Sequence, residues 1–121
     1  MDKRFRQRER VKTRNDIDKI FSTGTRCTRG CLTVIVLRND LGYSRLGIGV
    51  SSKLCCAVRR NRLKRLVREA YRLNKPSIPT GLDIFVLPKE TDAAFDEIER
   101  DLVEAAGKAC EKLEKREGQN Q

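Results

Sequence analysis

AVRRNRLKRLVREAYRL, residues 57–73, has the periodicity of one helix with two different faces. At about 100° per residue, one face collects the apolar side chains, which are Leu63, Leu66, Val67, Ala70 and Tyr71. The opposite face collects long polar and cationic side chains, which are Asn61, Lys64, Arg65, Arg68 and Arg72. We therefore expect this helix to pack against a core on one side and to present a strongly positive stripe on the other.

The first turn of this helix carries three further cations, Arg59, Arg60 and Arg62. Cations at a helix N-terminus oppose the macrodipole, at a cost of roughly 0.3–1 kcal/mol each when exposed. Because the fold gains nothing from this placement, the arginines indicate a polyanionic partner. The phosphate groups of a nucleic acid are the obvious candidate.

The overall charge is unevenly distributed along the chain. The 121 residues include 27 Lys and Arg against 17 Asp and Glu, for a net charge of +10. Residues 1–75 hold 21 basic and 6 acidic residues, a net charge of +15, whereas residues 76–121 have a net charge of −5. The first part is thus the expected nucleic-acid-binding part, and the second reads as ordinary domain surface.

Composition excludes several classes of function. No run is long and apolar enough to span a bilayer or to serve as a signal peptide, so we expect a soluble cytoplasmic protein with no membrane partner. There is no histidine, which excludes a self-contained histidine-based ribonuclease. The five cysteines lack paired CxxC spacing, so we expect neither a disulfide framework nor a zinc site.

The remaining patterns predict a single α+β domain in the order α-β-β-β-α-β-α, with a mixed four-stranded sheet packed by helices. In chain order, the predicted elements are a helix at 14–22 capped by Thr13, strands at 25–28, 31–38 and 45–51, the helix at 57–73, a strand at 83–87, and a helix capped by Thr91 that runs to about 115. We expect residues 1–12 to form a basic arm, 13–116 the folded domain, and 117–121 a polar tail.

Two local features suggest close contacts. Gly47 and Gly49 leave one face of their strand bare, which often means that another backbone or a ligand approaches closely. On the first helix, Ile17, Ile20 and Phe21 share one face. Core packing is the simpler interpretation of that face, but Phe21 can instead be a partly exposed platform on which a base stacks.

The stretch RLGIGVSSKLCCAVRRNRLKRLVREAYRL, residues 45–73, resembles the protein subunit of bacterial ribonuclease P. The resemblance rests on the glycine-bearing strand, Lys53, and the ordered groups Arg60-Asn61-Arg62, Lys64-Arg65 and Arg68-Glu69. It extends over nearly the whole chain, from the basic N-terminus to the final amphipathic helix.

The resemblance implies a component of a ribonucleoprotein endoribonuclease that removes the 5′ leader of precursor tRNA. In this family the RNA subunit is the catalyst and uses Mg²⁺, so no catalytic residue and no metal ligand is expected on this chain. The implied partners are ribonuclease P RNA and precursor tRNA, with no obligate protein partner. The implied fold contains an unusual left-handed β-α-β crossover, although right-handed crossovers are the rule.

The candidate site residues form two groups. For binding the catalytic RNA and the precursor, they are Lys53, Arg59, Arg60, Asn61, Arg62, Lys64, Arg65, Arg68 and Arg72. For a cleft that holds the single-stranded leader, the resemblance implies Ile17, Phe21, Ile35 and Lys89.

The chain departs from the family pattern near this helix. Cys55-Cys56 stands where members often have Gly-Asn, and Ser52 where a second Lys is common. Isoleucines at 17 and 35 replace usual aromatic residues, so we expect Phe21 to carry more of the leader contact. A thiol at a helix N-terminus beside arginines should have a lowered pKa, which makes Cys56 a candidate reactive cysteine.

Two other classes of function stay open from the residues alone. One is a non-catalytic RNA-binding module of ribosomal or RNA-chaperone type with a similar fold. The other is a metal-dependent nuclease built from Asp92, Asp96 and Glu99, although these acids read better as part of a solvated helix face.

Overall fold

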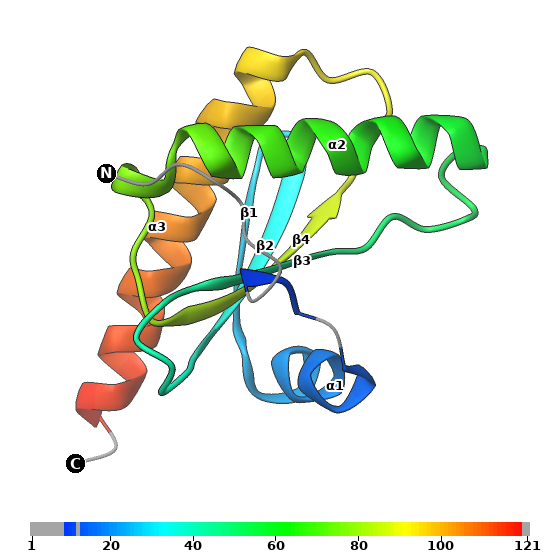
Figure 1. Ribbon diagram of the computed structural model, residues 1–121. Helices are drawn as coiled ribbons and strands as arrows, with labels where there is room; N and C mark the ends of the chain where they lie inside the picture. Colours follow the sequence, from blue (N-terminus) through cyan, green and yellow to red (C-terminus); the bar gives the residue numbers. More distant parts are fainter. Residues whose placement is uncertain (1–8, 12, 120–121) are drawn as a thin grey trace.

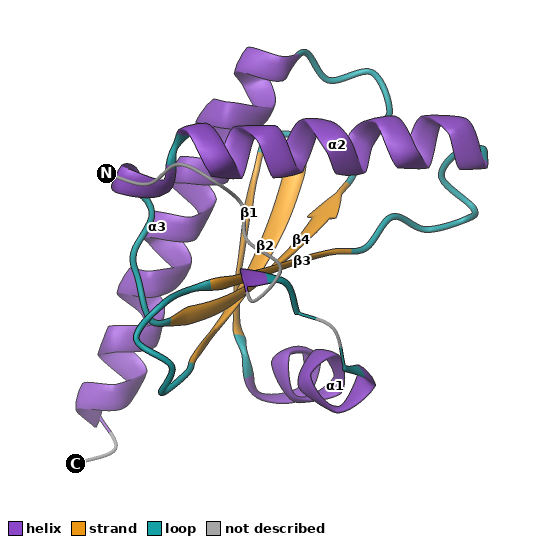
Figure 2. Ribbon diagram, in the orientation of Figure 1, coloured by secondary structure: helices purple, strands orange, loops and turns teal. Residues whose placement is uncertain are grey.

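The computed structural model describes residues 9–11 and 13–119, so most of the predicted basic arm lies outside the described residues. The three helices and four strands follow the predicted order α-β-β-β-α-β-α (Figures 1 and 2). They are α1 (Arg14–Thr23), β1 (Thr25–Arg29), β2 (Leu32–Arg38), β3 (Arg45–Ile48), α2 (Ala57–Leu73), β4 (Leu82–Pro88) and α3 (Phe95–Gln119), with a short 3₁₀ turn η2 (Lys75–Ser77) after α2.

The four strands form one mixed sheet in the order β1-β2-β4-β3. β2 pairs antiparallel with β1 and β4, whereas β3 pairs parallel with β4. Two parallel neighbours need a crossover connection, and α2 supplies it. The α+β class and the mixed four-stranded sheet are therefore confirmed, while the left hand of the β3-α2-β4 crossover stays a prediction.

Successive side chains of β2 and β4 point to opposite faces of the sheet, and both faces are apolar. Val34 and Val86 are paired in register and belong to the larger core, which α2 and α3 cover. Ile35 and Phe85 are also paired and belong to the smaller core, which includes Ile20 of α1. Successive residues of a strand point to opposite faces, so this neighbouring register places α1 on the face opposite α3.

The last helix differs from the prediction at both ends. It begins at Phe95, because Ala93 turns into the core at 8% exposure and Ala94 accepts the first helical hydrogen bond, from the Ile98 N–H at 3.0 Å. Thr91 is thus not its cap. The helix also continues to Gln119, where Arg38 of β2 binds Glu117 through two hydrogen bonds of 2.9 and 3.0 Å.

Candidate nucleic-acid interface

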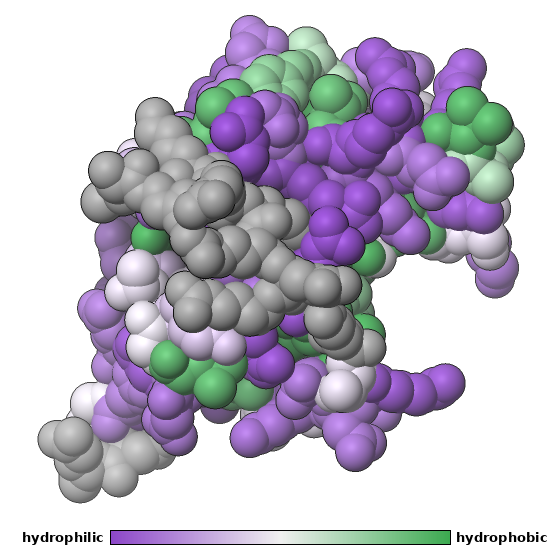
Figure 3. All heavy atoms as spheres, in the orientation of Figure 1, coloured by the Kyte–Doolittle hydropathy of each residue, from purple (hydrophilic) through white to green (hydrophobic). Residues whose placement is uncertain are grey.

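The amphipathic division of α2 is as predicted. Leu63, Val67, Ala70 and Tyr71 are at most 2% exposed and hold the helix on the core. Asn61, Arg62 and Arg65 are exposed on the outer side, and Lys64, Arg68 and Arg72 are half-buried. Because the buried residues begin at Leu63, the first turns of α2 extend beyond the sheet (Figure 1). Figure 3 shows a hydrophilic outer surface with an apolar tip at this end, where Val58 is 77% exposed.

Few of the cations on this face have an acidic partner. Arg72 binds Glu69 in bidentate fashion, and Arg59 lies 3.7 Å from the exposed carboxylate of Asp92. Arg60 donates a hydrogen bond of 2.8 Å to the backbone oxygen of Cys55. Within residues 9–11 and 13–119, the four remaining cations form no ion pair; they are Arg62, Lys64, Arg65 and Arg68. Unpaired cations on one face favour a polyanion.

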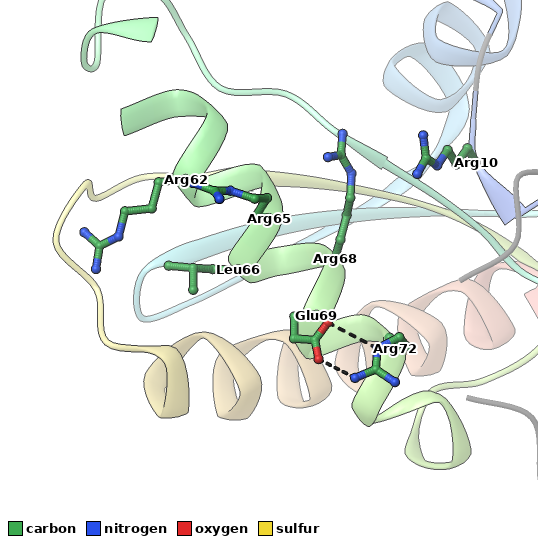
Figure 4. A pocket seen from close by; sticks show the side chains of 7 residues that line it. All are labelled: Arg10, Arg62, Arg65, Leu66, Arg68, Glu69 and Arg72. Atoms are coloured by element: carbon green, nitrogen blue, oxygen red, sulfur yellow. Dashed lines mark hydrogen bonds and ion pairs between the residues drawn. The ribbon is translucent and has the colours of Figure 1, made fainter. Parts of the chain in front are cut away.

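A groove of about 870 Å³ lies along this face. Its lining consists of Arg62, Arg65, Leu66, Arg68, Glu69 and Arg72 of α2, together with Arg10. Figure 4 shows Arg10 and Arg68 extending toward the same space from different segments. The sequence-based interpretation missed Arg10, because it assigned residue 10 to the arm; the basic composition of that arm was the only available signal.

The N-terminal end of α2 has no side-chain cap. Cys56 occupies the cap position, is exposed, and makes no capping hydrogen bond. The backbone N–H of Arg59, followed by that of Val58 and by the charge of Arg59, lowers the pKa of the Cys56 thiol from its ordinary value. Lys53 is exposed in the turn before the helix, where its backbone N–H donates to Ser51 Oγ at 3.1 Å.

Phe21 on α1 is partly exposed, and a second aromatic ring packs against it. Its ring is 41% exposed and meets the ring of Phe85 edge-on, with centroids 5.1 Å apart and an interplanar angle of 61°. Phe85, only 6% exposed, lies over the two glycines of the β3 segment. A Cβ added at Gly47 would sit 2.6 Å from that ring, and one at Gly49 would sit 2.9 Å from it. A group does approach the glycines closely, as predicted, but it is the side-chain ring of Phe85 and not the backbone or ligand that the sequence suggested.

The other predicted leader-facing residues are not all available at the surface. Ile17, on the same helix as Phe21, is half-buried and packs against the smaller core. Ile35 is only 1% exposed beneath α1, in contact with Ile20 and Phe85, so its side chain supports the surface and cannot line it. Lys89 is exposed after β4, four residues beyond Phe85, which is about 13 Å along an extended strand. The structure thus brings Ile17 and Phe21 together and leaves Lys89 apart from them.

A buried charge network fixes α1 on the sheet. Arg45 of β3 binds Asp83 of β4 through two hydrogen bonds of 2.6 and 2.8 Å and reaches Asp16 of α1 at 3.3 Å. The predicted Thr13 cap is present, since Thr13 Oγ1 accepts from the Asp16 N–H at 3.1 Å. The Thr13 hydroxyl and the Arg45 guanidinium together lower the pKa of Asp16. These contacts set the position of α1, and with it that of Phe21.

The carboxylates of the alternative nuclease do not converge. Asp92 has a side chain 84% exposed, and Glu99 accepts a hydrogen bond of 2.9 Å from Asn74. Across the part of the chain that the structure describes, no three His, Cys, Asp or Glu side chains are placed to hold a metal ion. The geometry gives this alternative no support. Separately, none of the described helices is long and apolar enough to cross a membrane.

Comparisons with known proteins agree in sequence and in structure. A family model described as Ribonuclease P matches residues 5–110. A relative named "Ribonuclease P protein component" from Thermotoga maritima is 46% identical over 90 residues, covering 74% of this chain and 77% of its own. Another of that name, from Clostridioides difficile, is 36% identical over 101 residues, covering 81% and 89%.

Two solved structures have the same fold. The ribonuclease P protein from Thermotoga maritima superposes with a TM-score of 0.73 at 38% identity, covering 79% of this chain and 93% of the other. The one from Staphylococcus aureus has a TM-score of 0.75 at 31% identity, with coverage of 84% and 94%.

Proposed function

Because this chain belongs to the bacterial ribonuclease P protein family, we propose that it binds ribonuclease P RNA through α2 and promotes removal of the 5′ leader from precursor tRNA. In this proposal the chain makes and breaks no bond itself. The catalytic groups belong to the RNA, the protein requires no second protein, and the complex acts in the cytoplasm.

The observation that carries the proposal is the set of cations on the outer face of α2 that form no ion pair with any residue the structure describes. Arg62, Arg65 and Arg68 line one groove, while the buried side of the helix keeps its axis fixed on the core. Each guanidinium can bind a phosphate with two parallel hydrogen bonds, which sets the register of the RNA as well as adding affinity. Neutralised phosphates release counterions, so the interaction should be strongly salt-dependent.

We assign the leader to the surface of α1 around Phe21. A single-stranded leader has unstacked bases, and a partly exposed ring can stack on any of them with little sequence preference. The edge-on support from Phe85 keeps that ring in place. Ile17 adds apolar contact beside it, whereas Lys89, the residue after β4, is suited to a phosphate of the same RNA strand.

Mg²⁺ belongs to the RNA in this proposal. The described residues contain no cluster of side chains that fits a metal ion, so no step is assigned to a metal held by the protein. The cations of α2 act indirectly, because neutralising crowded phosphates lowers the repulsion that Mg²⁺ must otherwise screen. We therefore expect the protein to lower the Mg²⁺ concentration that cleavage requires.

The test is cleavage of a precursor tRNA with a 5′ leader at low Mg²⁺ by a bacterial ribonuclease P RNA, with and without this protein. We expect strong stimulation at the mature 5′ end and no cleavage by the protein alone. Lys64→Ala on α2 should reduce the stimulation. Lys108→Ala on α3, which removes the same charge from an exposed site elsewhere, should leave it intact.

Other outcomes would identify the alternatives. RNA binding without any stimulation would indicate a general RNA-binding module. Cleavage by the protein alone in Mg²⁺, abolished when Asp92, Asp96 and Glu99 are replaced, would indicate a carboxylate nuclease.

A further inference from the structure

The segment just before α1 is anchored to the end of α2 by a desolvated ion pair. Glu9 has a side chain only 7% exposed, and its carboxylate oxygens lie 2.8 and 3.0 Å from Lys75 Nζ. Lys75 belongs to η2, directly after α2, and its own side chain is 18% exposed. The two residues are 66 positions apart in the chain, so this contact joins the N-terminal segment to the far end of the helix.

The same segment is also held by the edge of the sheet. β3 is an edge strand, and Arg10 forms a parallel bridge with its residue Leu46. The Val11 N–H donates a hydrogen bond of 2.9 Å to the Leu46 carbonyl. Residues 9–11 thereby lie beside the exposed edge of β3, below α2 in the view of Figure 1. We name these three residues the N-terminal clasp.

Arg10 lies between the two anchors and projects into the arginine groove. Its side chain is exposed and lines the groove opposite the arginines of α2. In Figure 4 its guanidinium reaches toward that of Arg68. Each phosphodiester of an RNA backbone has two non-bridging oxygens, so one phosphate between Arg10 and Arg68 can accept hydrogen bonds from both guanidinium groups.

We propose that the N-terminal clasp makes Arg10 a phosphate-binding residue of the RNA interface, so that an RNA backbone lies between α2 and residues 9–11. Glu9 and Lys75 are positioning residues, because their ion pair fixes the backbone from which Arg10 extends. This inference rests on the proposed function. In it, residues 9–11 form a second side of the RNA interface, which α2 would otherwise form alone.

A substitution of Glu9 distinguishes this proposal from an effect of net charge alone. Glu9→Ala removes a negative charge near an RNA-binding surface, so charge alone would make binding tighter. The proposal predicts weaker binding instead, because the loss of the Lys75 contact releases Arg10 from its position. Glu69→Ala is the matched control, since it removes an acid that lines the same groove but holds only Arg72.

The experiment measures equilibrium binding of the full-length variants to ribonuclease P RNA over a range of salt concentrations. We expect Arg10→Ala to weaken binding about tenfold, as for a lost charge-assisted hydrogen bond, and to reduce the salt slope by about one phosphate contact. Glu9→Ala should weaken binding severalfold, and Glu69→Ala should leave it unchanged or tighter. Arg29→Ala, on the opposite edge strand β1, should leave it unchanged.

Two results would overturn the clasp. One is an Arg10→Ala protein that binds as Arg29→Ala does; the other is a folded Glu9→Ala protein that binds more tightly than the wild type. Arg10 is exposed, so the first comparison is decisive even where melting shows that Glu9→Ala has unfolded. Failure of the wild-type protein to bind the RNA at all would overturn the proposed function, whereas these results leave it standing.

Discussion

Phe21 and Arg65 are both exposed, but different physical effects keep them at the surface. A charged guanidinium is well solvated, and Arg65 forms no ion pair among the described residues. Phe21 is a large apolar residue and is nevertheless 41% exposed. The contact with Phe85 and the Arg45 network hold α1 so that the ring stays partly exposed.

We predict that Phe21→Ala and Arg65→Ala affect different steps. Loss of the ring should weaken holoenzyme binding of a leader-bearing precursor by about 1–3 kcal/mol, the usual contribution of one stacked base. Binding of mature tRNA, which has no leader, should not change. Arg65→Ala should instead weaken assembly with the RNA. Titrations of the holoenzyme with precursor and mature tRNA measure the first effect, and titration of ribonuclease P RNA with the protein measures the second. An equal loss for mature tRNA would contradict the leader role of Phe21.

The cysteines should differ sharply in reactivity, because the thiolate is the reactive form. Backbone N–H groups and Arg59 lower the pKa of Cys56, so its thiolate fraction near neutral pH exceeds that of an ordinary thiol. Burial, together with Asp101, raises the pKa of Cys31 to about 12, so this thiol stays protonated.

Alkylation of the native protein at pH 7, followed by mass spectrometry, should therefore label Cys56 first and Cys31 last. Labelling of Cys56 should fall off as the pH is lowered, with its midpoint below that of a free cysteine. Bound RNA should protect it, and Cys56→Ser removes the fast phase. A Cys56 rate no greater than that of free cysteine would refute the prediction.

At the scale of elements, the β1–β2 hairpin is joined to α3 by one buried carboxylate. Asp101 Oδ2 accepts hydrogen bonds from the Cys31 N–H at 3.0 Å and the Cys31 thiol at 3.1 Å. The preceding residue, Gly30, has φ of +51°, and a Cβ there would lie 2.3 Å from the same oxygen. Glycine is thus required at this turn both for its conformation and for the space that Asp101 occupies.

We predict that Asp101→Ala destabilises the fold by about 1–3 kcal/mol at pH 7, because it leaves the buried Cys31 N–H without an acceptor. Burial works to raise the pKa of Asp101, but the hydrogen bonds from Cys31 and the nearby Arg100 keep it below the ordinary value of 3.8. A lowered pKa stabilises the folded state above the ordinary value, and this contribution disappears as the pH falls below it.

The difference between wild type and Asp101→Ala should therefore be largest near neutral pH and should shrink below about pH 4. Denaturant unfolding at pH 7 and pH 3 measures it. Asp92→Ala, which removes an exposed carboxylate, should change stability by less than about 0.5 kcal/mol. A stability gap for Asp101→Ala that persists unchanged at pH 3 would show that the carboxylate charge is not involved.

At the scale of the whole molecule, the charge asymmetry has a structural counterpart. The positive part of the sequence supplies α1, the first three strands and α2, whereas the acidic part supplies β4 and α3, whose first turn carries Asp96 and Glu97. Acids near a helix N-terminus complement the dipole, so α3 is built for stability. The strongly positive surface is therefore carried by α2 and not by its neighbour α3.

We predict a steep salt dependence for binding to ribonuclease P RNA. The four cations of α2 that form no ion pair within residues 9–11 and 13–119 should give a slope of log affinity against log salt of about −3 or steeper, at roughly 0.7–0.9 per phosphate. Filter binding between low and physiological salt tests this, with Arg65→Ala expected to reduce the slope by about one unit. A slope near zero would indicate that phosphate contacts do not dominate the complex.

The elements whose signals are local could be predicted from the order of residues alone. The two faces of residues 57–73 come from a repeat of 3.6 residues, and the Thr13 cap and the bare glycine face of β3 come from side chains a few positions apart. These features were predictable because helix periodicity, capping and strand alternation depend on near neighbours. The positive face of α2 follows from the same repeat, so the order of residues along the chain is enough to identify most of the candidate RNA-binding side chains.

Contacts between residues that are distant in the chain could not be predicted from local patterns, because they depend on how the elements pack. The burial of Ile35 under α1, the Phe85 ring over Gly47, and the late start of α3 at Phe95 each depend on how an element packs on its partner. Arg10 joins the groove because Glu9 meets Lys75, a contact between residues 66 positions apart. A periodic pattern in the sequence cannot predict such a contact. The contact depends on the register of the sheet and on the path of the crossover, and both depend on the whole chain.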